Sequence, residues 1–135
     1  MNHDPALQAL IDQVRAARAE RRALEIRGGG TKAFYGGLPA GEPLDARPLR
    51  GISSYEPTEL VVTARAGTPL AELEAALAEK GQCLPFEPPR FAAADGTGGT
   101  VGGMVAAGLT GPARAAVGGV RDYVLGATLL NGRAE

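Results

Sequence analysis

The sequence predicts an α+β domain, in which a small mixed sheet is flanked by two helices and glycine-rich loops gather at one edge. Three observations predict this class: two segments with apolar residues at helical spacing, several short strand-like runs, and 20 clustered glycines among 135 residues. Clustered glycines indicate places where the backbone must approach other atoms closely. The length suits a single domain with one core.

The first helix is expected over Pro5–Arg22. Asp4 is a suitable N-cap, and the proline that follows suits the first helical position. Leu7, Leu10 and Val14 then recur at helical spacing, which predicts one buried face.

The second helix is expected over Pro69–Lys80. Thr68 is its predicted N-cap, and Leu70, Leu73 and Leu77 share one face. A lysine in the last turn and a glycine directly after it supply the expected stop signal.

Short strands are expected at residues 24–26, 60–63 and 124–130, the second of them buried. Asn131-Gly132 is a strong hairpin-turn signal, but only three residues follow it. Residues 1–135 are therefore expected to form a partial domain whose C-terminal remainder is missing. Within it, residues 1–23 are expected to form an N-terminal helical region.

Composition excludes several functions. The net charge is −1, with 14 basic and 15 acidic residues, so no general field favours nucleic acid. Cys83 is the single cysteine, which excludes an intrachain disulfide and a paired-cysteine zinc site. The single histidine, His3, lies in a terminus that is expected to fray, so no serine–histidine–aspartate triad is expected in the interior. No metal site is expected. Because no signal peptide or membrane-spanning apolar run is evident, a cytoplasmic protein is expected.

The first glycine cluster, Gly28-Gly29-Gly30, directly follows a predicted strand. With the residues after it, the cluster matches the permissive dinucleotide fingerprint, but residues 34–39 cannot open the required helix. An ordinary Rossmann fold is therefore disfavoured, and no lysine lies in Walker A context. A backbone nest remains, in which Thr31 adds a hydroxyl and Arg27 or Lys32 a positive charge.

A second cluster occupies residues 96–103. Taken alone, either cluster is more often a turn or packing device than a phosphate site. Together they favour a long, phosphate-bridged cofactor, because such a ligand needs more than one amide-lined loop.

At these residues the chain resembles the vanillyl-alcohol-oxidase, or PCMH-type, family of FAD-binding flavoproteins. The resemblance covers essentially the whole chain. R-G-G-G-T at residues 27–31 is similar to the family's first pyrophosphate loop, and T-V-G-G at residues 100–103 is similar to its second. G-V-R-D-Y-V-L-G at residues 119–126 resembles the segment that leads into a strand beside the flavin.

The resemblance implies a set of FAD-binding residues: Arg27, Gly28, Gly29, Gly30, Thr31, Lys32, Pro85, Thr100, Val101, Gly102, Gly103 and Asp122. Some family members attach FAD covalently through a histidine near the first loop. Thr31 and Lys32 stand there instead, so noncovalent FAD is expected.

Three further phrases, at residues 54–57, 60–70 and 84–89, are similar to the FAD-binding subunits of glycolate oxidases. That likeness implies oxidation of glycolate or a related small 2-hydroxy acid to the 2-oxo acid. It also implies partner subunits, namely a second flavin subunit and an iron–sulfur subunit, through which the protein could associate with a membrane. No catalytic residue is assigned, and neither Glu87 nor Asp122 is named as one. Residues 1–135 on their own are expected to be inactive.

Two alternatives remain open at the level of sequence. One is a noncatalytic module whose glycine loops bind another phosphate ligand or simply pack. The other is a subunit-docking module that binds no cofactor.

Overall fold

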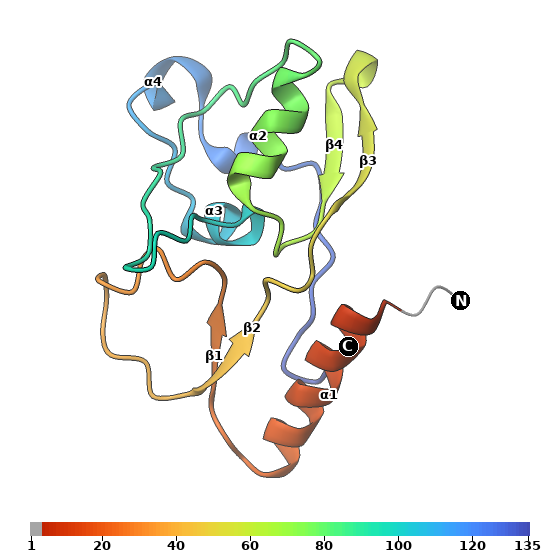
Figure 1. Ribbon diagram of the computed structural model, residues 1–135, viewed down its shortest axis with the longest axis vertical. Helices are drawn as coiled ribbons and strands as arrows, with labels where there is room; N and C mark the ends of the chain where they lie inside the picture. The colour runs from red at the N-terminus through yellow and green to blue at the C-terminus, as the bar shows by residue number, and fades with distance from the viewer. Residues whose placement is uncertain (1–3) are drawn as a thin grey trace.

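The computed structural model describes residues 4–135 and confirms the α+β class (Figure 1). The elements, in chain order, are α1 (Pro5–Ala19), β1 (Leu24–Arg27), β2 (Glu42–Asp45), β3 (Ile52–Glu56), the 3₁₀ turn η1 (Pro57–Glu59), β4 (Val61–Ala64), α2 (Leu70–Ala78), α3 (Val101–Ala107), α4 (Arg114–Val117) and the 3₁₀ turn η2 (Val120–Asp122).

Parallel and antiparallel pairing occur in two separate two-stranded sheets. β1 and β2 pair in parallel, from Leu24 beside Glu42 to Arg27 beside Asp45. β3 and β4 form an antiparallel pair. In Figure 1 the first pair lies close to α1, and the second lies beside α2. The strand expected at residues 60–63 forms at residues 61–64, and its residues are half-buried or exposed instead of buried.

Helix α1 begins as expected and ends earlier than expected. The carboxylate of Asp4 accepts hydrogen bonds from the amides of Ala6 and Leu7, at 3.0 and 3.4 Å. The helix stops at Ala19 rather than Arg22, because Arg21 adopts a left-handed backbone conformation with φ of 55°.

Helix α2 is shorter at both ends than the predicted Pro69–Lys80, and its predicted cap is wrong. Pro69 holds the N-cap position and provides no side-chain cap. The Thr68 hydroxyl instead accepts a hydrogen bond from the amide of Gly51 and donates one to its carbonyl, at 3.0 and 3.1 Å. Thr68 therefore joins the start of α2 to the start of β3.

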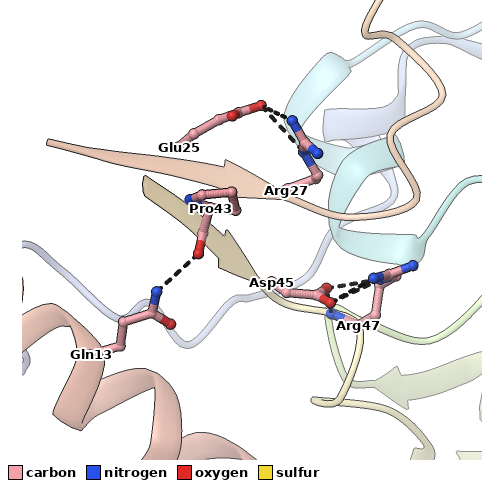
Figure 2. A network of polar contacts seen from close by, with 6 residues as sticks. All are labelled: Gln13, Glu25, Arg27, Pro43, Asp45 and Arg47. Carbon is pink, nitrogen blue, oxygen red and sulfur yellow. Dashed lines mark hydrogen bonds and ion pairs between the residues drawn. The ribbon is translucent and has the colours of Figure 1, made fainter. Parts of the chain in front are cut away.

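Two hydrophobic clusters form the core. The larger one contains Leu70, Leu73, Leu77, Phe86, Met104 and Val120. The smaller one contains Leu10, Val14, Leu44 and Ala134. Figure 2 shows a polar contact beside the smaller cluster, where the Gln13 side chain of α1 donates to the Pro43 carbonyl of β2 at 2.9 Å. The smaller cluster thus anchors α1 to β2, and the larger one packs α2 against α3 and η2.

The expected strand at residues 124–130 is absent. Within residues 4–135 this segment pairs with no strand, so it lacks the ladder hydrogen bonds that define one. A turn does follow, in which the Ala134 amide donates to the Asn131 carbonyl at 2.9 Å. Leu130 and Ala134 pack in the cluster around α1, which brings the end of the described chain back to its first helix.

No helix among residues 4–135 is both long enough and apolar enough to cross a membrane.

Candidate functional site

The two glycine clusters, far apart in sequence, lie in direct contact. A β-carbon at position 29 would lie 2.0 Å from the carbonyl oxygen of Gly98. One at position 28 would lie 2.6 Å from the hydroxyl oxygen of Thr100. Since neither approach leaves room for a side chain, glycine is required at both positions of the first loop.

Beside this contact is a cleft of about 450 Å³. Residues of the first loop, of the segment after β2, of α2 and of the second glycine cluster form its walls. Its lining includes Gly29, Thr31, Lys32, Arg47, Arg50, Gly67, Pro69, Leu70, Ala71, Glu74, Pro88, Pro89, Arg90, Phe91, Ala92, Thr97, Gly98, Gly99, Thr100, Met104, Ala107 and Leu109. The volume is within the range usual for small-molecule and cofactor sites.

Backbone donors line both glycine arms of the cleft. Within residues 4–135, the amides of Gly29, Thr31 and Lys32 donate no hydrogen bond. The same holds for the amides of Gly98 and Gly99. All of these residues except the exposed Gly98 are buried or half-buried. Because amides shielded from water require an acceptor, two such arms suit the oxygens of an anion.

Hydroxyl groups add to these donors. Thr31 and Thr100 are both buried at the cleft, with exposed fractions of 7% and 6%. The Thr100 hydroxyl accepts from the amide of Gly103 at 3.2 Å, which caps α3 and fixes the threonine in place. A hydroxyl can also donate, so Thr100 retains a donor for a ligand oxygen.

The charged side chains of the cleft are mostly cationic. Three arginines and Lys32 line it, against the single carboxylate of Glu74. Each arginine is bound to a carboxylate: Arg47 to Asp45 at 2.7 Å, Arg50 to Glu72 at 2.5 Å and Arg90 to Glu74 at 2.5 Å. Within residues 4–135 the ammonium of Lys32 has no carboxylate partner.

Electrostatics beside the cleft follow from these pairs. The Arg47 side chain, by its hydrogen bonds, lowers the pKa of Asp45 below its ordinary value, and Asp45 in turn raises the pKa of Arg47. Hydrogen bonds from Thr97, first from its amide, lower the pKa of Asp95. Both carboxylates are therefore ionised over the neutral range, and Asp45 holds the Arg47 guanidinium in place.

Four of the sequence-predicted site residues line the cleft, namely Gly29, Thr31, Lys32 and Thr100. Two further predicted residues lie outside the cleft lining and hold its walls in position. The Gly102 amide donates to the Ala66 carbonyl at 2.8 Å, and Val101 packs against the larger core cluster. These contacts position α3 and the second loop.

Gly28 and Gly30 belong to the first loop, whereas Gly103 lies in the first turn of α3. Gly30 has a φ of 70°, a backbone conformation that favours glycine. The role of Gly28 and Gly103 is local, because each lies against Thr100.

The remaining predicted residues lie outside the cleft lining. Arg27 is exposed and binds Glu25 of its own strand, at 2.8 Å (Figure 2). Pro85 is exposed. Asp122 accepts from the Gly119 amide at 2.6 Å and stabilises η2. Their assignment to a cofactor site stays a prediction.

Sequence reasoning missed several lining residues, chiefly Arg47, Arg50, Glu74, Arg90 and Phe91. One signal was available for Arg90 and Phe91, because the prolines at positions 88 and 89 enforce an extended chain directly before them. The arginines after β2 gave no such signal. No group of three or more candidate metal ligands occurs in the part of the chain that the structure describes.

The arrangement suits a class of protein: an α+β domain with a cationic, amide-lined cleft of the kind that fits a phosphate-bridged cofactor. Comparison with known proteins identifies the family. The FAD binding domain family matches residues 6–135, and the chain belongs to it. Over 128 residues the chain is 51% identical to the glycolate oxidase subunit GlcE of Escherichia coli (strain K12). The match covers 95% of this chain and 35% of that protein.

FAD is therefore the cofactor, as the sequence resemblance predicted. The residues present fit its diphosphate. At position 29 a β-carbon would occupy the junction of the two arms, and the open amides, two hydroxyls and surplus cations suit a dianionic group.

Proposed function

We propose that this chain forms the diphosphate-binding part of a flavin-dependent oxidoreductase that converts glycolate, or a related 2-hydroxy acid, to the 2-oxo acid. The single observation that supports it best is the contact between Gly29 and Gly98, which joins two amide-lined arms at one cationic cleft. The name of the GlcE relative supports the choice of substrate.

When bound, FAD would supply the redox chemistry, because a flavin can take up the two electrons and two hydrogens that the 2-hydroxy acid loses on becoming the 2-oxo acid. This chain's own residues bind and orient. The amides of Gly29 and Gly98 would hold phosphate oxygens, and the hydroxyls of Thr31 and Thr100 would complete the set of donors. Fixed donors of this kind hold a cofactor in one place without reorganising during the reaction.

FAD binding is proposed to be noncovalent. Thr31 and Lys32 follow the glycines of the first loop, and neither side chain is a histidine. The sole histidine, His3, lies outside the described residues. Denaturation should therefore release all of the flavin into the supernatant.

The protein is further proposed to act with other subunits. The E. coli relative is named as a subunit of glycolate oxidase, and its length extends well beyond the region matched here. The family resemblance favours a second flavin subunit and an iron–sulfur subunit as the partners that carry electrons away.

An FAD titration of the purified protein tests the proposal, with flavin fluorescence and melting temperature as the two measurements. We expect saturable binding that raises the melting temperature. Gly29→Val should weaken binding at least tenfold, roughly the effect of one lost charge-assisted hydrogen bond, because the new side chain separates the two arms.

Gly37→Val is the matched control. It lies in the loop that follows the first glycine cluster, and a β-carbon at position 37 would have no atom within 4 Å. Its affinity should equal that of the unsubstituted protein. A folded protein that binds no FAD, or equal affinity for both variants, would contradict the proposed site.

A further inference from the structure

One cation of the cleft differs from the other three. Arg47, Arg50 and Arg90 each bind a carboxylate at 2.7 Å or less. Lys32 has no such partner among residues 4–135, although it lies in the same cleft. Its charge is thus the only cleft charge in the described chain that a ligand can use without displacing a carboxylate.

We propose that Lys32 is the residue that selects for a diphosphate group, so that the cleft prefers dinucleotides and nucleoside diphosphates to uncharged nucleosides and flavins. The inference rests on the proposed function, and it assigns the charge recognition of that site to one side chain. The three arginines then serve to position the walls of the cleft.

Position supports this assignment. Lys32 is half-buried and directly follows Thr31, the buried hydroxyl of the first arm. Its own amide donates no hydrogen bond in the described chain, so backbone and side chain offer donors at one place. An ammonium is a compact charge with three donors, which suits a group with several equivalent oxygens.

The arginines are poorer candidates because each would have to leave its partner. Arg90 binds both carboxylate oxygens of Glu74, at 2.5 and 2.6 Å. The Glu74 side chain is only 19% exposed, so removal of the arginine would leave a largely buried charge unpaired. A phosphate must compete with that pair, whereas at Lys32 it competes with water.

A comparison of ADP with adenosine tests the assignment, since the two ligands share base and sugar and differ in the diphosphate. The unsubstituted protein should bind ADP more tightly than adenosine. Lys32→Gln should weaken ADP and FAD about tenfold, the effect of one charge-assisted hydrogen bond, and leave adenosine unchanged. Calorimetric titration gives each affinity directly.

Lys80→Gln is the matched control, because it removes the same charge from an exposed position beyond α2. Its affinities should equal those of the unsubstituted protein, and melting curves should show all variants folded. The double variant Arg50→Gln/Glu72→Gln removes a paired cleft cation without leaving its carboxylate unpaired.

The outcomes separate the two proposals. If FAD binds and Lys32→Gln keeps the full preference for ADP, the assignment to Lys32 is wrong while the FAD site stands. The assignment is equally wrong if the Arg50/Glu72 double variant abolishes the preference and Lys32→Gln does not. If the unsubstituted protein binds neither FAD nor ADP, the proposed function itself fails and the assignment fails with it.

Discussion

At the scale of single residues, Asp45 and Arg47 show how β2 prepares one wall of the cleft. The Asp45 carboxylate accepts from Nε of Arg47 at 2.9 and 3.0 Å, and from Nη2 at 2.7 Å (Figure 2). It also accepts from the Arg47 amide at 2.9 Å. Four donor contacts from one residue hold that guanidinium in a single orientation at the cleft.

This pair predicts an acid-sensitive contribution to stability. Because Arg47 lowers the pKa of Asp45 in the folded state, the contribution is complete above the ordinary value of 3.8 and is lost as the pH falls through the lowered value. Asp45→Asn should remove that part of the pH dependence.

Urea unfolding between about pH 2 and pH 5 measures the effect. We expect the free energy of unfolding of Asp45→Asn to fall less steeply with acid than that of the unsubstituted protein. Some slope should remain, because the pKa of Asp95 is also lowered. Identical slopes for the two proteins would show that the pair does not couple protonation to folding.

At the scale of elements, Thr68 joins a strand to a helix. Its side chain is fully buried, with an exposed fraction of 0%, and bonds both backbone groups of Gly51 directly before β3. Thr68→Val should cost about 1–3 kcal/mol of unfolding free energy, because it leaves the half-buried Gly51 amide without a partner, whereas the Gly51 carbonyl keeps its bond from the Arg65 amide at 2.9 Å.

Thr68→Ser is the control for this prediction, since it keeps the hydroxyl and loses only a methyl group. Chemical denaturation should place it close to the unsubstituted protein. If Thr68→Ser and Thr68→Val lose equal stability, packing of the methyl group, and not the two hydrogen bonds, holds β3 to α2.

The elements that sequence predicts well are those determined by local signals. Asp4 and the proline after it mark the start of α1, and the apolar spacing of α2 places Leu73 and Leu77 in the core. Prediction fails where a distant partner decides. Thr68 looks like a cap, but Gly51, 17 residues away, takes its hydroxyl.

The candidate site divides in the same way. The glycine arms could be predicted because a backbone nest needs consecutive residues without side chains. The positions of Arg47 and Arg90 could not be predicted, because they depend on how the segment after β2 and the segment that contains Pro88 and Pro89 lie relative to α2. Residues 124–130 have strand-like composition, yet strand formation requires a partner that no described segment supplies.

At the scale of the whole molecule, the cleft lies between the two hydrophobic clusters. Its first arm follows β1, whose Leu24 packs in the cluster of α1. Its other walls come from α2 and the second arm, where Leu70 and Met104 belong to the larger cluster. A ligand in the cleft therefore contacts elements anchored in both parts of the core.

This arrangement predicts that FAD stabilises both clusters together. At a free concentration of 100 times Kd, ligand binding adds about 2.7 kcal/mol to the stability of any unit that must open to release it. Amide hydrogen exchange should slow at Leu10 and Val14 in α1 and, by a similar factor, at Leu73 and Leu77 in α2. Riboflavin, which lacks the diphosphate, is the matched control and should protect neither helix to that extent. Protection confined to α2 would mean that the first glycine arm opens while FAD stays bound, and the diphosphate would then be held by the second arm alone.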